Sequence, residues 1–117
     1  MTDCIFCKIR DGVIPSKKYY EDENMFVIAD IDPRAKKHFL AIPKNHYKLL
    51  ADMSELDREV LGKVFSTIAK IAGEVLGLDN GYRLIINQGD DAGQTVPHLH
   101  IHIVGGEKLG WEQMCEK

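Results

Sequence analysis

The 117-residue sequence has no long apolar run, no excess of basic residues and only three cysteines. None of its apolar stretches approaches the roughly 20 residues that cross a bilayer, so we expect no membrane span. The first ten residues carry Asp3, Lys8 and Arg10 and no apolar core, so no secretory signal is expected. With 15 basic against 18 acidic side chains, a broad nucleic-acid-binding surface is not expected either.

The small number of cysteines argues against a disulfide-bonded scaffold. Three is an odd number, and two of them, Cys4 and Cys7, are spaced C-x-x-C. In a chain without a secretory signal, this pattern favours a reducing, cytoplasmic setting and either a metal site or a redox pair. The sequence also lacks internal repeats, low-complexity stretches and linkers. Its length is that of one ordinary domain, so we predict a single domain over residues 1–117.

One long helix is the clearest local prediction. Ser54 is a good N-cap, Asp57 stands at the capping-box position, and Gly77 provides a C-terminal stop. Between them, apolar residues recur at the steps of three and four that are typical of an amphipathic helix. These residues are Leu56, Val60, Val64, Ile68, Ile71 and Val75.

Short apolar segments separated by turns predict strands in the rest of the chain. A short helical turn is expected near the N-terminus, over residues 4–11. The expected strands cover residues 18–21, 25–29, 38–42, 82–87 and 98–104. Strands with long connections beside one long helix indicate an α+β fold with a mostly antiparallel, five-stranded sheet.

Three of the five histidines alternate along the last expected strand, at His98, His100 and His102. On a strand their side chains share one face, while the apolar residues between them face the core. Neighbouring imidazoles then lie about 6–7 Å apart, so one metal ion cannot bind all three unless the strand bends. A polar, glycine-containing loop over residues 88–95 precedes them, and its backbone amides suit phosphate oxygens. The alternative is a metal-trapping or solvent-exposed histidine strand.

This alternation resembles the histidine-triad (HIT) motif, and the surrounding sequence resembles the Hint branch of that superfamily, in its zinc-bearing bacterial-type variant. The similarity runs from about Cys4 to Trp111. It includes the segments 30–33, 38–43, 81–83 and 93–98 and the single residue Asn87. The resemblance implies the HIT-like fold, with a short N-terminal helix and a homodimer across which the sheet continues.

The resemblance also implies a nucleotidyl hydrolase or transferase that acts at the α-phosphate of purine nucleotides, with adenosine phosphoramidates as the substrate type. The middle histidine of the family motif attacks phosphorus and forms a covalent nucleotidyl-histidine, and this role falls on His100. His102 and His38 would form a polar relay beside it. Imidazole is nucleophilic at neutral pH provided that one nitrogen is unprotonated. The other nitrogen must then donate, and a backbone carbonyl near His98 is the expected acceptor.

Two other functions are compatible with these residues. One is a dinucleoside polyphosphate hydrolase of the Fhit type, although Gly105-Gly106 after the triad, where that type has Pro-Arg, favours the Hint branch. The other is a nucleotide-binding scaffold protein with vestigial activity. No organic cofactor is implied by any of these possibilities.

Substrate contacts are implied by the same resemblance. The nucleoside pocket falls on Asp30, which would accept from ribose hydroxyls, on Ile31, which would pack on the base, and on Phe6. Contacts with the α-phosphate or the leaving group fall on Asn87, Gln94 and Thr95, although each of these could instead satisfy its own loop. Trp111 resembles a C-terminal residue that reaches the partner's active site, and the alternative is a surface aromatic.

The C-x-x-C pair needs two more ligands to complete a tetrahedral zinc site. A redox pair is the alternative, but the strand–helix context of thioredoxin-like motifs is absent. Two buried free thiols are a further alternative. Zinc-bearing relatives use two cysteines and two histidines, and the resemblance therefore implies a structural zinc on Cys4, Cys7, His46 and His98. Cys115 is assigned no role.

Overall fold

The computed structural model describes residues 4–113, so Cys115 lies outside the described residues. In chain order the helices and strands are α1 (Ile5–Arg10), β1 (Tyr20–Glu21), β2 (Met25–Ala29), β3 (Lys37–Pro43), α2 (Glu55–Glu74), β4 (Tyr82–Ile85) and β5 (Ile101–Gly105), with short 3-10 turns at Leu50–Asp52 and Asp90–Ala92. Within these residues no helix combines the length and the apolar character that crossing a bilayer requires.

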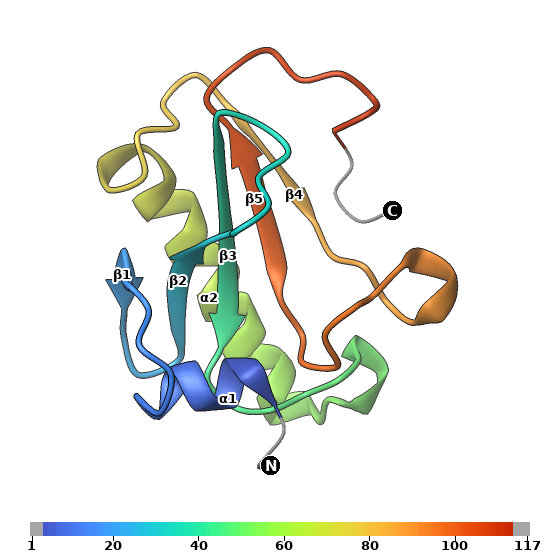
Figure 1. Cartoon of the computed structure of the whole chain (residues 1–117). Coiled ribbons are helices and arrows are strands. Elements are labelled where there is room, and N and C mark those ends of the chain that lie inside the picture. The colour runs from blue at the N-terminus through green and yellow to red at the C-terminus, as the bar shows by residue number, and fades with distance from the viewer. Residues whose placement is uncertain (1–3, 114–117) are drawn as a thin grey trace.

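The strands form one antiparallel sheet in the order β1-β2-β3-β5-β4 (Figure 1). The last strand of the chain, β5, is thus inserted between β3 and β4. This arrangement places the segment that carries the clustered histidines beside β3, which carries His38. The α+β fold with a five-stranded antiparallel sheet, one long helix and a short N-terminal helix is confirmed.

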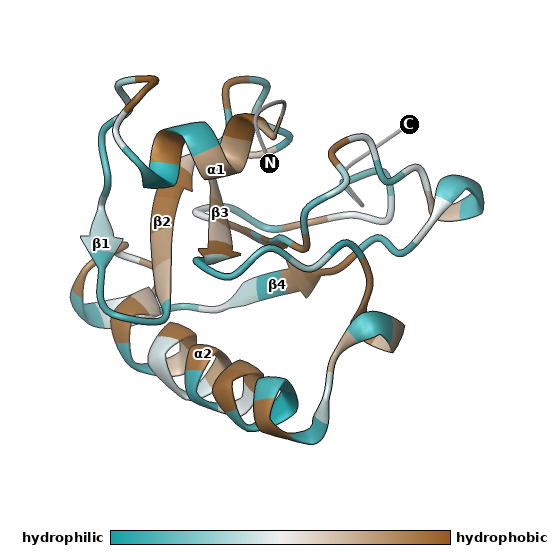
Figure 2. Cartoon of the chain, turned by 90° about the horizontal axis from the view of Figure 1, so that it is seen from below, coloured by the Kyte–Doolittle hydropathy of each residue, from teal (hydrophilic) through white to brown (hydrophobic). Residues whose placement is uncertain are grey.

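The two helices lie on opposite faces of the sheet (Figure 2). Ile101 and Ile103 of β5 pack with Val64 and Ile68 of α2 in the larger buried apolar cluster. On the other face, α1 packs against β2 and β3 in a second cluster. His102 pairs in register with Leu40 of that second cluster, so its side chain lies on the α1 face.

Local signals placed the long helix correctly. The Ser54 Oγ accepts from the Asp57 backbone N–H at 3.2 Å, and the Asp57 carboxylate accepts from the Ser54 N–H at 3.1 Å, which completes the predicted capping box. Beyond the other end, Gly77 has φ 72, and the Leu78 N–H donates to the Ala72 carbonyl at 2.8 Å. The predicted start and stop are both confirmed.

The apolar stripe of α2 is buried only along its middle. Leu56 is 74% exposed and Val75 is 47% exposed, whereas Val64, Ile68 and Ile71 are buried. Leu76, next to Val75, is only 2% exposed and belongs to the same core cluster as Ile71, so the core continues past this end of the helix. Leu56 and Val75 are thus apolar residues of the predicted stripe that the sheet does not cover.

The strand that was expected over 98–104 begins only at Ile101. The His98 N–H donates to the Val96 carbonyl, and the Leu99 N–H donates to the Tyr47 carbonyl, so these residues do not join the ladder with β3. The predicted start of the strand is therefore wrong, because both His98 and His100 precede it and only His102 lies within it. The Phe6 ring of α1 nevertheless contacts both His98 and His100, so these rings lie on the α1 side with His102. Similarly, β4 ends at Ile85 where a strand to residue 87 was expected.

Candidate functional site

Four of the five histidines are buried: His38, His98, His100 and His102. A buried imidazole is costly unless its nitrogens have hydrogen-bonding partners or bind a metal. The partners of these rings divide them into two adjoining groups. One group surrounds His100 and His102, and the other surrounds His98.

His100 has a fixed orientation and tautomer. Its Nδ1 lies 2.8 Å from the His98 carbonyl oxygen, which can only accept, so Nδ1 carries the proton. In the neutral ring, Nε2 is then the nitrogen with the lone pair. The Phe6 ring packs edge-on against this imidazole at a centroid distance of 5.2 Å. The acceptor is the carbonyl that the sequence suggested.

His38 and His102 form a directed chain of hydrogen bonds. The Arg34 backbone N–H donates to His38 Nδ1 at 3.0 Å, so the proton of neutral His38 is on Nε2. That N–H donates to His102 Nδ1 at 2.9 Å, with Asp30 Oδ2 at 3.3 Å from the same nitrogen. The proton of neutral His102 is therefore on Nε2. The His100 and His102 rings pack edge-on with their centroids 5.1 Å apart, so the two imidazoles adjoin each other.

Ligand atoms of Asp30, His38 and His102 also lie within 4.8 Å of one another, a spacing that could hold a metal. The Arg34 N–H argues against this interpretation, because it occupies the lone pair of His38 Nδ1. A metal on His38 Nε2 would then require the ring to lose its second proton, which costs far more than the neutral hydrogen-bonded form. This group is better described as a chain of hydrogen bonds that runs from the Arg34 N–H through His38 to His102.

A cavity of about 410 Å³ opens onto these histidines. Its apolar wall comes from α1, through Ile5, Phe6 and Ile9, and its polar end from His100 and His102. The volume is within the range typical of small-molecule sites. Predicted site residues that the fold brings to the cavity, besides the two histidines, are Phe6, Asp30, Ile31 and Thr95.

Other predicted residues lie elsewhere. Trp111 is 83% exposed and does not line the cavity. Both polar atoms of the Gln94 amide already have partners. Its Oε1 accepts from the Gly89 N–H, and its Nε2 donates to the Lys48 and Val96 carbonyls. Within residues 4–113, Asn87 Nδ2 is a buried donor without a hydrogen-bond partner, so it retains a proton for an incoming acceptor.

Sequence reasoning missed two contributors to the site. The backbone N–H of Arg34 sets the His38 tautomer, and a backbone amide leaves no signature in the sequence. Ile5 and Ile9 form part of the cavity wall, and their i, i+4 spacing on a short helix was the available signal.

The second group brings together Cys4, Cys7, His46 and His98, the four predicted metal ligands. The His98 Nδ1 lies 3.2 Å from Cys4 Sγ and 3.7 Å from Cys7 Sγ, and the His46 Nδ1 lies 3.3 Å from Cys7 Sγ. A tetrahedral zinc bonded to sulfur and nitrogen at its usual distances separates such atoms by about 3.6 Å. The spacing of the donor atoms therefore fits zinc.

The protonation of this group also suits a metal. His98 Nε2 donates to the Pro43 carbonyl at 2.9 Å, which leaves Nδ1 unprotonated toward the sulfurs. Burial lowers the pKa of His98 to about 4, so the ring is neutral at physiological pH. Burial also raises the pKa of the Cys7 thiol, and the adjacent Cys4 raises it further. A bound cation would offset this penalty by stabilising the thiolates.

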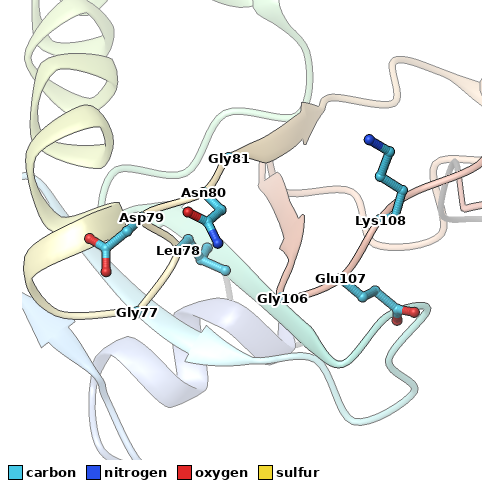
Figure 3. Close-up of a pocket in the computed structure, with 8 residues that line it drawn as sticks. All are labelled: Gly77, Leu78, Asp79, Asn80, Gly81, Gly106, Glu107 and Lys108. Atoms are coloured by element: carbon cyan, nitrogen blue, oxygen red, sulfur yellow. The ribbon is translucent and has the colours of Figure 1, made fainter.

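A larger cavity of about 530 Å³ lies where the loop between α2 and β4 meets the segment after β5 (Figure 3). Its lining comes from residues 77–81 and 106–108. None of the predicted site residues contributes to it. Of the two histidine groups, the one around His100 and His102 lines the smaller cavity.

Known proteins are similar to this chain in sequence and in fold. The HIT domain family matches residues 11–109. An uncharacterized HIT-like protein from Chlamydia muridarum is 44% identical over 106 residues, which cover 91% of this chain and 83% of that protein. The solved structure of a histidine triad protein from Clostridium difficile is 45% identical with a TM-score of 0.88, and the match covers 94% of this chain and 96% of that one.

Two further solved structures bear on the site. A HIT family hydrolase from Clostridium thermocellum has a TM-score of 0.87 at 43% identity, with 94% of this chain and 96% of that chain covered. A zinc-bound histidine triad family protein from Mycobacterium smegmatis has a TM-score of 0.77 at 39% identity, with 94% and 81% covered.

The antiparallel sheet places adjoining histidines beside a cavity, with His38 on β3 and His100 and His102 at the start of β5. This arrangement is that of the histidine-triad class of proteins. The chain belongs to the HIT domain family.

Proposed function

We propose that the protein hydrolyses or transfers nucleotidyl groups at the α-phosphate of purine nucleotides, with adenosine phosphoramidate-type substrates. The observation that carries the proposal is the His100 tautomer, fixed by the His98 carbonyl at 2.8 Å, beside the His38–His102 relay at the end of a cavity. The naming of a similar structure as a HIT family hydrolase supports hydrolysis.

In the proposed first step, His100 Nε2 forms a bond to the α-phosphorus and the bond to the leaving group breaks with its electron pair. His102 Nε2–H donates a hydrogen bond to the leaving group, which takes its proton from solvent water. His100 becomes a cationic nucleotidyl-imidazolium, and the His38–His102 pair stays neutral. The His98 carbonyl stabilises the imidazolium, because its bond to Nδ1–H becomes charge-assisted.

In the second step, water attacks phosphorus. The water oxygen bonds to phosphorus, one water proton passes to solvent, and the bond between His100 and phosphorus breaks with its electron pair on His100 Nε2. The products are the nucleoside monophosphate and the protonated leaving group, and the enzyme regains its starting tautomers. Asp30 and the Arg34 N–H keep His38, and through it His102, in the donor orientation.

The cavity supports a nucleoside beside the reacting phosphate. Asp30 would accept from the ribose hydroxyls, and Ile31, which is fully exposed at the cavity mouth, would pack on the base opposite Phe6. The Thr95 hydroxyl would lie near the leaving group. The family resemblance assigns a phosphate contact to Asn87, whose buried Nδ2 has no hydrogen-bond partner among residues 4–113, although Asn87 does not line the cavity. Gln94, through its bonds to the Gly89 N–H and to the Lys48 and Val96 carbonyls, would hold the loop over residues 88–95 beside the phosphate.

We further propose that Cys4, Cys7, His46 and His98 bind a structural zinc ion. The donor spacing, the neutral His98 and the zinc-bound relative support this assignment. When bound, zinc would fix the N-terminal helix to the segment before β5 without taking part in the reaction.

We also propose a homodimer in which β4 pairs with its copy, so that the sheet continues across the interface. β4 is an edge strand of the sheet, and its Tyr82 and Leu84 are exposed. Exposed strand edges with apolar side chains favour pairing with another strand. Trp111, which points into solvent within one chain, would then be available to the partner.

The test is hydrolysis of an adenosine phosphoramidate and of a diadenosine polyphosphate by wild type and His100→Ala. We expect wild type to prefer the phosphoramidate and His100→Ala to lose at least 1,000-fold in kcat/KM, a loss on the order of that seen when a covalent nucleophile is removed. Leu56→Ala, at an exposed position on α2, is the matched control. A preference for the polyphosphate would favour the Fhit-type activity, and no turnover by wild type would favour a scaffold role.

A further inference from the structure

The segment that follows β5 lies against the loop that leads into β3. We call residues 30–36 the entry loop. Gly106 brings the two backbones together, because a Cβ at this position would lie 3.2 Å from the Lys37 backbone nitrogen and 3.0 Å from its Cγ. With φ 83, Gly106 also adopts a conformation that favours glycine. The close approach of the two backbones thus explains why the second residue of the Gly105-Gly106 pair is glycine.

Two side chains of this segment hold the entry loop on both sides of Ala35. The Glu107 carboxylate accepts from the Lys36 backbone N–H at 2.8 Å, and Figure 3 shows Glu107 beside this loop while Lys108 points elsewhere. The Gln113 Nε2 donates to the Arg34 carbonyl at 3.0 Å. We call Glu107 and Gln113 together the clamp.

The clamp is itself anchored on the sheet. Gln113 Oε1 accepts from the Gly110 N–H at 2.7 Å, and the Gly110 carbonyl accepts from the Arg83 guanidinium of β4 at 2.7 Å. A chain of hydrogen bonds therefore runs from β4 through the clamp to the backbone of Arg34. The N–H of that same residue donates to His38 Nδ1.

We propose that Glu107 and Gln113 are positioning residues, which act through the entry loop to keep the Arg34 N–H on His38 Nδ1. Without this donor, His38 could carry its proton on either nitrogen. In the form with the proton on Nδ1, His38 Nε2 no longer donates to His102, and His102 loses the partner that keeps its own proton on Nε2. The consequence for turnover rests on the proposed function, whereas the tautomer does not.

The experiment measures the His38 tautomer by nitrogen-15 NMR of histidine-labelled protein. In wild type we expect an unprotonated Nδ1 and a protonated Nε2. In the double variant Glu107→Ala, Gln113→Ala we expect a mixture of tautomers. The kcat should fall about three- to tenfold, the range that corresponds to one lost hydrogen bond, with KM within about twofold. Lys108→Ala, at an exposed neighbouring position, should match wild type in both measurements.

Single variants keep the test decisive if the double variant folds poorly. Glu107→Gln retains an oxygen for the Lys36 N–H and should restore the wild-type tautomer and rate. Gln113→Glu retains the acceptor for Gly110 but replaces the donor to Arg34, so it should mix the tautomers. A single wild-type tautomer in Gln113→Glu, or in the double variant when it folds, would overturn the proposal. Absence of nucleotide hydrolysis by wild type would refute the proposed function and leave the tautomer result to decide this inference.

Discussion

Replacing one cysteine of the buried Cys/His group tests whether a metal stabilises it. Cys7→Ala removes a sulfur that lies 3.3 Å from His46 Nδ1 and 3.7 Å from His98 Nδ1. A metal present at about 1,000 times its Kd stabilises the folded state by about 4 kcal/mol. For a chain of this length, that free energy corresponds to a Tm shift of roughly 15 °C. The variant should lose this contribution entirely.

The assay compares wild type and Cys7→Ala before and after exhaustive chelation, by zinc content and by the Tm from circular dichroism. Wild type should carry one zinc per chain, and chelation should lower its Tm by roughly 15 °C. Cys7→Ala should carry little zinc and should not respond to chelation. Because alanine also loses packing, the matched reference for the variant is chelated wild type. An unchanged Tm in zinc-free wild type, or a full equivalent of zinc in Cys7→Ala, would refute the reasoning.

Three further predictions follow from the site and the core. Ile31→Ala should raise KM about three- to tenfold and leave kcat and Tm unchanged, because this exposed side chain contributes only its packing on the base. Steady-state kinetics measure KM and kcat, and a thermal melt measures the Tm. In metal-free protein, burial lowers the pKa of His98 to about 4, so the unfolded chain binds more protons between pH 4 and the ordinary histidine value. The free energy of unfolding should therefore be highest above the ordinary histidine pKa and should fall by up to about 3 kcal/mol as the pH is lowered to 4. Denaturant titrations at several pH values measure this fall, and a free energy that does not change with pH would contradict the prediction. In the same assay, Ile68→Ala should lower the free energy of unfolding by about 2–5 kcal/mol and Leu56→Ala by less than about 0.5 kcal/mol, since of the two only Ile68 is buried. Equal losses in the two variants would contradict the packing described for α2.

Features set by neighbouring residues could be predicted from the sequence. The capping box of Ser54 and Asp57 lies within one helical turn, and the carbonyl that binds His100 belongs to a residue two positions away. The alternation of Ile101 and Ile103 with His102 assigned the two faces of β5 correctly. The four members of the Cys/His group came from the family resemblance, because nothing local relates His46 to Cys4 and Cys7.

Features set by tertiary contacts could not be predicted. The start of β5 depends on the Leu99 N–H bonding to Tyr47, which lies far away in the sequence. The exposure of Leu56 depends on which side of α2 packs on the sheet. The His38 tautomer depends on a backbone amide of Arg34, whose position depends in turn on Glu107 and Gln113. Such backbone donors become visible only when the chain is folded.

The central claim is that His100 carries the nucleotidyl group during turnover. Rapid acid-free quenching of wild type with a slowly hydrolysed adenosine phosphoramidate, followed by peptide mass spectrometry, tests this claim most directly. We predict an added adenosine monophosphate group that fragmentation places on His100 and that is absent from His100→Ala. An adduct on His98 or His102, or full turnover by His100→Ala, would contradict the account.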